Sequence, residues 1–311
     1  MIELLSRRDV NVTGSWAGNP PWRERLHNER DHEELHQVTS DHTETTADIS
    51  GLDGRQRVSA AGMYDYFLGG THNSAADRIA ADRVLSVSPE SRVAAQANRI
   101  FLINAVRHLA AEHGVRQFLD LGSGLPTVEN VHQVAHAVDP DIRVVYVDND
   151  PEVLPEAQAL LLDEEETVGY IEADMRVPES ILTHEVTQRL IDFSQPVGVL
   201  MVASMHFVGD DYDPQGLVRR FMEDATPGSY LVLSHVSIDD MDPVVWEGVK
   251  ISNPRMTRPL FFRTGEEIRG FFDGLELLPP GMVDVAQWRP GEAGPRQPTP
   301  VTIWCAVAKN R

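Results

Sequence analysis

The feature that most restricts the fold of this chain is a short apolar run that ends in a turn with two glycines, Phe118–Gly124. A helical pattern of apolar residues follows over residues 127–138, and a second apolar run follows at residues 143–147. Glycine permits a tight turn and lets a ligand approach the backbone closely. The segment therefore predicts a strand, a ligand-binding turn, a helix and a second strand parallel to the first.

Strands and helices keep alternating as far as residue 236. The expected strands are residues 117–121, 143–147, 168–173, 197–203 and 230–236, and the expected helices between them are residues 127–138, 151–162, 178–190 and 214–225. Such alternation is typical of a parallel sheet with helices on both faces.

The end of the chain departs from this alternation. One more helix is expected at residues 265–272, before two late strands at residues 275–278, extending toward Val285, and residues 301–307. Because no crossover helix separates these two strands, we expect them to pair antiparallel. The predicted fold is therefore α/β and Rossmann-like, with a mostly parallel seven-stranded sheet that ends in an antiparallel C-terminal hairpin. Nicotinamide-binding Rossmann domains usually lack such a hairpin.

The first 55 residues differ from the rest. Residues 27–50 are rich in Asp, Glu, His, Arg and Thr and contain almost no large apolar side chains. So little apolar surface does not offset the entropy lost on ordering. We expect residues 1–55 to form a disordered acidic extension and residues 56–311 to form one domain. In that domain, helical patterns at residues 58–68, 75–85 and 92–112 precede the sheet.

Charge and composition limit the partners. The formal net charge is −21, and no basic cluster offsets it, so we expect no nucleic-acid substrate. The single cysteine, Cys305, cannot form a disulfide within the chain and is expected to be a small core residue. Since no apolar stretch reaches membrane-spanning length, we expect no membrane partner and a cytoplasmic location.

Acidic residues end three of the expected strands: Asp120, Asp148 and Asp174. Asp148 can accept both ribose hydroxyls of an adenosine, which fits either a dinucleotide or S-adenosylmethionine. The dinucleotide fingerprint places a third glycine at position 127, where this chain has Thr. A carboxylate at Asp120, inside the turn, would repel a pyrophosphate but suits an amino group and a sulfonium. Asp174 could accept from an adenine amino group. The alternative is that Asp120 and Asp174 only cap strand ends.

The pattern resembles the class I S-adenosylmethionine-dependent methyltransferases, and more closely the S-adenosyl methyltransferase family once known as DUF574. The segments that carry the resemblance are residues 63–70 (MYDYFLGG), 97–99 (ANR), 117–127 (QFLDLGSGLPT), 144–151 (VVYVDNDP), 227–235 (PGSYLVLSH), 271–275 (FFDGL) and 288–290 (WRP). The similarity runs from about Arg57 to the end of the chain. It implies the fold, with an N-terminal helical lid at about residues 57–114, and S-adenosylmethionine as the cofactor. It implies no particular methyl acceptor.

Residues in the turn, at the strand ends and in the lid form the expected cofactor site. They are Asp120, Gly122, Gly124, Asp148, Asn149, Asp174, Met175, Tyr64, Tyr66, Asn73, Arg99 and Ser204. Arg99 could pair with the methionine carboxylate of the cofactor, with the two tyrosines and Asn73 closing over that end. The alternative is that the helix of Tyr64 and Tyr66 is structural and packs its aromatic rings on the sheet.

His206, after the fourth expected strand, is the candidate general base. It could equally pack against that strand end or cap it. The cluster Asp210, Asp211 and Asp213 could serve a metal-assisted reaction, but a solvated turn is the favoured interpretation. Trp246 and the Phe261-Phe262 pair are expected either to line an acceptor pocket or to belong to the core.

These observations predict a methyltransferase that uses S-adenosylmethionine and acts on a small-molecule acceptor. One alternative is a non-catalytic sensor of the cofactor or its demethylated product, which the few acid–base groups and the acidic extension keep open. The other is a nicotinamide-dependent oxidoreductase, but the catalytic Tyr-x-x-x-Lys pair that it predicts is missing from the sequence. A homodimer is one option for the assembly.

Overall fold

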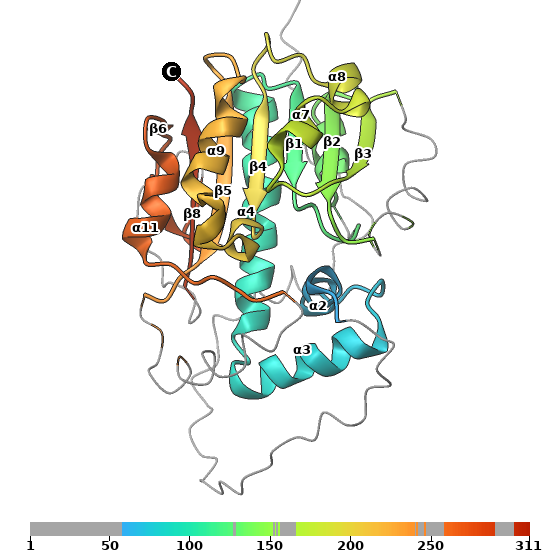
Figure 1. Ribbon diagram of the computed structural model, residues 1–311, viewed down its shortest axis with the longest axis vertical. Helices are drawn as coiled ribbons and strands as arrows, with labels where there is room; N and C mark the ends of the chain where they lie inside the picture. The colour runs from blue at the N-terminus through green and yellow to red at the C-terminus, as the bar shows by residue number, and fades with distance from the viewer. Residues whose placement is uncertain are drawn as a thin grey trace, which may run out of the picture. The chain divides into compact units, whose positions relative to one another are not determined.

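One sheet of eight strands organises the described part of the chain (Figure 1). The computed structural model describes residues 58–126, 129–151, 153, 155, 166–239, 241, 246, 258–289 and 302–311. These residues belong to the unit Ala47–Arg311. The predicted disordered extension and most of the predicted helix at residues 151–162 lie outside the described residues.

The strand order is β3-β2-β1-β4-β5-β8-β6, with β7 also paired to β8. The strands are β1 (Gln117–Leu121), β2 (Arg143–Asp148), β3 (Val168–Glu172), β4 (Gly198–Val202), β5 (Tyr230–Val236), β6 (Glu276–Leu277), β7 (Val283–Asp284) and β8 (Ile303–Lys309). Strands β1 to β5 are parallel to one another, and β8 runs antiparallel to β5, β6 and β7. The predicted α/β fold with an antiparallel C-terminal end is confirmed. The strand expected from residue 275 toward Val285 is interrupted and forms β6 and β7, so the sheet has eight strands instead of seven.

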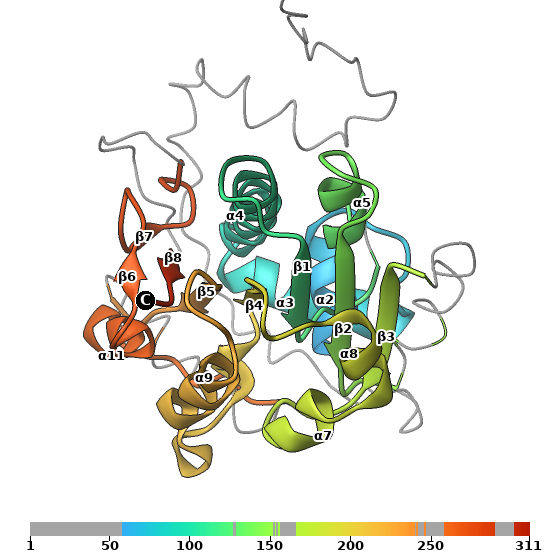
Figure 2. The same cartoon turned by 90° about the horizontal axis from the view of Figure 1, so that it is seen from above.

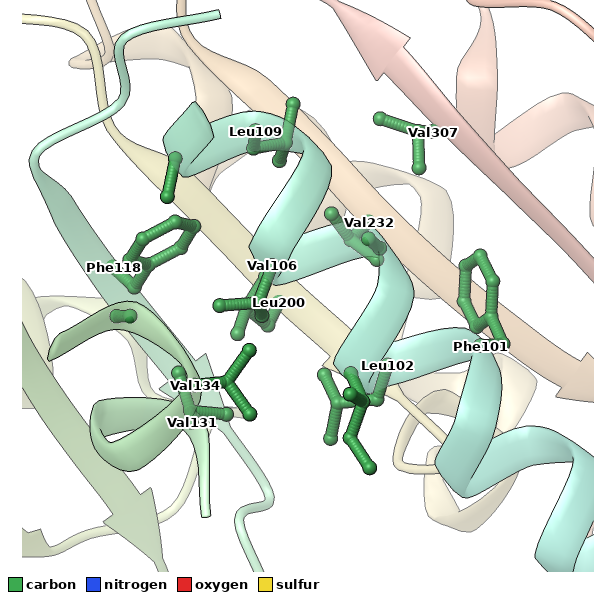
Figure 3. Packing of buried hydrophobic residues seen from close by; sticks show 14 of the residues in the cluster. Phe101, Leu102, Val106, Leu109, Phe118, Val131, Val134, Leu200, Val232 and Val307 are labelled. Atoms are coloured by element: carbon green, nitrogen blue, oxygen red, sulfur yellow. The ribbon is translucent and has the colours of Figure 1, made fainter. Parts of the chain in front are cut away.

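Helices cover both faces of this sheet (Figure 2). On one face, α4 (Ser91–Glu112) packs over β4, β5 and β8, and α5 (Val131–His136) packs over β2. Figure 3 shows α4 inserting Phe101, Val106 and Leu109 among Phe118 and Val232 of the strands. Apolar residues on both faces of every central strand explain why the strands are continuous hydrophobic runs in the sequence.

On the opposite face lie α7 (Pro178–Leu182), α8 (Glu185–Leu190), α9 (Pro214–Glu223) and α11 (Gly265–Arg269). The sequence predicted a single helix over residues 178–190, but the structure divides it in two. The His184 side chain accepts a hydrogen bond from the Val186 amide and caps a new helix, α8. A side chain that serves the backbone in this way favours a helix start over a helix interior.

Two further helices, α2 (Ala60–Phe67) and α3 (Ala75–Val87), lie beyond the carboxyl ends of the parallel strands (Figure 1). Ser59 caps α2, and its hydroxyl donates to Asp150 in the loop after β2 (2.7 Å). Helices α2 and α3 therefore lie at the edge where the parallel strands end, whereas α4, which also precedes the sheet in sequence, covers one of its faces. In the described residues, no helix has the length and apolar character needed to cross a membrane.

Candidate functional site

The strand order reverses between β1 and β4, and ligands of open α/β sheets bind beyond the carboxyl ends of strands at such a point. Here β1 ends in the predicted turn, in which Gly122 and Gly124 have φ values of +80° and +66°. The Gly122 amide donates to Val147 O at 2.8 Å, and the Gly124 amide donates to the Asp148 carboxylate at 2.8 Å. The structure therefore brings the two glycines and Asp148 together, as expected.

Asp148 is buried, and its carboxylate accepts two hydrogen bonds from backbone amides. One carboxylate oxygen accepts from Gly124 and the other from the Asp150 amide at 2.9 Å. Burial raises the pKa of Asp148, whereas these two amides and the charge of Arg258 oppose that rise. Each carboxylate oxygen can accept a second hydrogen bond, so both remain capable of binding a ribose hydroxyl.

Asp120, the penultimate residue of β1, is only 5% exposed. Burial raises its pKa to about 7, an effect that Arg99 opposes and Asp148 reinforces. Arg99 of α4 is also buried and donates to Glu129 O at 2.9 Å. A cationic ligand at this turn would favour the ionised form of Asp120.

The loop after β3 holds Asp174 and Met175. The Met175 methyl group reaches the turn, 3.2 Å from the position of a Cβ added to Gly122. Asp174 pairs with the Arg176 guanidinium and forms a hydrogen bond with Asn149. Although partial burial acts to raise the pKa of Asp174, the bonds and charge of Arg176 outweigh it and lower the pKa. Asp174 therefore stays ionised, with Arg176 competing for its oxygens.

The tip of β4 also borders the glycine turn, beside the loop after β3. Ala203 has the left-handed value φ +54°, and Ser204, only 4% exposed, lies against the glycine turn. A Cβ on residue 122 would stand 2.5 Å from Ser204 Cβ. In the part of the chain that the structure describes, the buried Ser204 Oγ has no hydrogen-bond partner.

His206 lies in a short 3-10 helix after β4, where it packs edge-to-face against His235 and Phe207. Burial, followed by the positive charge of Arg263, lowers the pKa of His206 to about 3. The imidazole is therefore neutral near pH 7. A group with so low a pKa provides little driving force for removing a proton. Its buried Nδ1 has no partner among the described residues.

The predicted lid residues divide into two groups. The Tyr64 hydroxyl points to α4, where it accepts from Asn98 and donates to Ala95 O. The Tyr66 hydroxyl donates to Asp82 of α3, and the Asn73 amide donates to Asp65 and Gly70 O. The polar groups of Tyr66 and Asn73 therefore hold the N-terminal helices together.

Two arginines near the site were not predicted from the sequence. Buried Arg263 donates to Val208 O (2.8 Å) and Asp210 (2.6 Å), and its Nη1 lies 2.8 Å from His235 Nε2. Arg258 donates to Asn149 at 2.8 Å. Both belong to the segment that crosses below the sheet in Figure 1, and neither sits in a recognisable local motif.

Two members of the acidic cluster after His206 form contacts within the protein. Asp210 pairs with Arg263, and the Asp213 side chain caps α9. Within the described ranges, no group of three or more metal-binding side chains occurs.

Cys305 is buried in β8 as a core residue, and burial raises its pKa well above the usual value. Trp246 packs edge-to-face on Phe262, and Phe261 Cζ lies 2.9 Å from the Cβ position of Gly209.

Comparisons with known proteins place the whole of this unit in one family. Residues 46–311 match the S-adenosyl methyltransferase family. The solved structure of a DUF574 family protein from Streptomyces avermitilis MA-4680 is 39% identical, with a TM-score of 0.76, and the match covers 82% of this chain and 98% of that one. A proposed methyltransferase from Thermobifida fusca YX is 38% identical, with a TM-score of 0.76, over 82% and 96% of the two chains. No curated protein matches the chain. The protein belongs to the S-adenosyl methyltransferase family and is an S-adenosylmethionine-dependent methyltransferase.

Proposed function

We propose that the protein transfers the methyl group of S-adenosylmethionine to a small-molecule acceptor at the carboxyl ends of β1 and β4. The observation that carries this proposal is the juxtaposition of Gly122 with the buried Ser204 hydroxyl, which has no partner in the described residues. A buried polar group without a partner is costly, and a ligand that bonds to it removes that cost. The absent side chain at Gly122 lets that ligand approach the backbone.

In this proposal the cofactor extends across the strand ends. Asp148 and Asn149 bind the ribose, Asp174 and Met175 bind the adenine, and Asp120 faces the positively charged methionine end. The remaining contacts come from the turn, from β4 and from the lid: Gly122, Gly124, Ser204, Arg99, Tyr64, Tyr66 and Asn73. Support comes from the positions of these residues around one edge of the sheet and from the buried carboxylates beside the turn.

A small acceptor agrees with the charge of the protein. The net charge of −21 repels a phosphate backbone, so we propose no nucleic-acid partner. When bound, the cofactor supplies a methyl group that is already activated toward displacement. The protein then has to align the acceptor atom with that group, which is a matter of positioning. His206 can accept a hydrogen bond from the acceptor, but its pKa of about 3 suits it to orientation more than to carrying a proton.

The alternative raised by the sequence is a sensor that binds the cofactor or its demethylated product without turnover. The sensor and the enzyme share a binding site but differ in whether S-adenosylhomocysteine accumulates. Incubation with methyl-labelled S-adenosylmethionine and pooled small metabolites should release S-adenosylhomocysteine and a labelled product. If the bound cofactor remains intact with every pool, the proposal of a small-molecule acceptor fails.

Calorimetry tests the cofactor site directly. S-adenosylmethionine should bind and NAD should not, and Asp148→Asn should weaken the binding by about tenfold or more, since the amide loses an acceptor. Asp141→Asn makes the same change at an exposed position and is the matched control. Equal affinity in wild type and Asp148→Asn would show that the ribose assignment is wrong. Binding of NAD in place of S-adenosylmethionine would contradict the whole site.

A further inference from the structure

A chain of buried hydrogen bonds joins the tip of β4 to helix α2. The Ala203 amide donates to Ser234 Oγ (2.9 Å), and the Ser234 hydroxyl donates to Asn98 Oδ1 (2.6 Å). Asn98 Nδ2 then donates to the Tyr64 hydroxyl (2.9 Å), which donates to Ala95 O (3.2 Å). Four elements take part: β4, β5, α4 and α2.

The first three donors point from β4 toward α2, and the last, the Tyr64 hydroxyl, points from α2 back to α4. Each of the two hydroxyls accepts one hydrogen bond and donates one, and the Asn98 amide links them by using its oxygen on one side and its nitrogen on the other. Asn98 is 1% exposed and Ser234 is fully buried, so water does not substitute for either. A carboxylate at position 98 could not donate to Tyr64, and an apolar residue could do neither. Chains of this kind strengthen cooperatively in a low-dielectric interior.

At its β4 end, the chain holds a strained residue. Ala203 adopts φ +54°, which disfavours side chains larger than glycine, so its amide needs a fixed partner. The next residue is Ser204, whose Cβ lies 2.5 Å from the position of a Cβ added to Gly122 and whose hydroxyl has no partner among the described residues. The direction in which Ser204 points therefore depends on the conformation that Ser234 stabilises at Ala203.

At its other end, the chain fixes α2 over the same edge of the sheet. Tyr64 is in the middle of α2, and Ser59 at the start of that helix bonds to Asp150 after β2. Helix α2 thus has two polar attachments near the proposed cofactor site. One of them runs directly to the loop after β2, and the other runs through Asn98 to the tip of β4.

We propose that Asn98 is a positioning residue that couples the docking of α2 to the orientation of Ser204 at the glycine turn. This inference rests on the proposed cofactor site. When S-adenosylmethionine engages Ser204, the Ala203 conformation is stabilised, and through Ser234 and Asn98 so is the contact of Tyr64 with α4. Cofactor binding and α2 docking therefore favour each other, as linkage between two sites requires.

A double-mutant cycle tests this coupling, with S-adenosylmethionine affinity measured by calorimetry. Tyr64→Phe and Ser234→Ala remove the two ends of the chain, and the two side chains are joined through Asn98. Each change should weaken binding by roughly 3- to 10-fold. The double variant should be little weaker than the worse single variant, because either change already interrupts the chain. In an Asn98→Leu background, neither change should weaken binding further. Multiplicative effects in both backgrounds would overturn the proposal.

The control pair combines Ser234→Ala with Tyr146→Phe. The Tyr146 hydroxyl is buried beside His132, outside this chain of hydrogen bonds, so these two effects should multiply. Thermal unfolding without ligand confirms that each variant is folded. If Asn98→Leu does not fold, the wild-type cycle and its control still decide the question.

Hydrogen exchange gives a readout that a merely structural Asn98 would not change. S-adenosylmethionine should slow exchange in residues 60–67 of the wild type, and this ligand-dependent protection should fall at least severalfold in Asn98→Leu. Full protection in Asn98→Leu would contradict the coupling. If folded wild type does not bind S-adenosylmethionine at all, the proposed cofactor site fails. If it binds but the cycle is multiplicative, only the role of Asn98 fails.

Discussion

Ser204 Cβ lies 2.5 Å from the point where a Cβ on Gly122 would stand, so the tip of β4 closes directly on the turn after β1. Real Cβ atoms do not approach one another so closely, and Gly122 also has φ +80°. Both the space and the backbone conformation at this position therefore require glycine. This contact joins the ends of β1 and β4, the two strands between which the strand order reverses.

Gly122→Ala should consequently abolish measurable S-adenosylmethionine binding and lower the free energy of unfolding by more than 2 kcal/mol, from strain plus overpacking. Gly114→Ala is the matched control, because Gly114 has φ +67° with nothing within 4 Å of an added Cβ. It should cost only about 1 kcal/mol of strain. Urea unfolding and calorimetry of both variants measure the difference. Equal losses of stability would show that Ser204 moves away freely.

The pKa of Asp120 makes the stability of the ligand-free protein depend on pH. Burial holds that pKa at about 7, so between pH 4 and 7 the folded protein keeps a proton that the unfolded chain has lost. Stability must therefore fall as the pH rises through this window. Asp120→Asn removes the titration and should gain on the order of 2–4 kcal/mol over wild type between pH 4 and pH 8. Urea unfolding at both pH values checks this, and parallel curves would exclude a raised pKa.

The pKa of His206 should make the stability of the folded protein depend on pH in the opposite direction. Its pKa of about 3 lies below the usual histidine value, so between pH 6.5 and 3 the unfolded chain binds a proton that the folded protein does not. Stability therefore falls as the pH drops through that window. His206→Gln should reduce the loss of stability between pH 7 and pH 5 by about 1 kcal/mol or more. Ring nitrogen chemical shifts provide a second measurement: a charged imidazole at pH 6 would contradict this prediction.

Arg263 should contribute far more to the free energy of unfolding than arginines at the protein surface such as Arg220. Arg263 is buried, and its removal leaves Val208 O and His235 without their donor. Arg263→Met should cost roughly 3 kcal/mol or more, and Arg263→Lys should recover little, since an ammonium cannot span the same acceptors. Arg220→Met, which breaks surface ion pairs to Glu179 and Asp224, should cost less than about 1 kcal/mol. Similar losses measured by urea unfolding would show that burial does not strengthen the Arg263 contacts.

The fold could be predicted from the sequence because the relevant signals are local. Apolar periodicity and the glycines after residue 121 predicted the parallel strands, the turn and the late antiparallel strand. The placement of Asp148 beside Gly124 followed from the same pattern, since adjacent parallel strands end at one edge. Local signals were less reliable for helix limits: the predicted helix over residues 178–190 is two helices, because His184 caps the second.

By itself, then, the sequence determined the α/β alternation, the ligand turn and its acidic strand ends, all of which depend on residues close together in the chain. Only the tertiary structure decided which side chains from distant parts of the sequence contact one another. Asn98 and Ser234 are 136 positions apart, and Arg258 and Asn149 are 109 positions apart. Their contacts depend on how packed elements align, which no local periodicity encodes. The low pKa of His206 arises in the same way, because burial is a property of the assembled core.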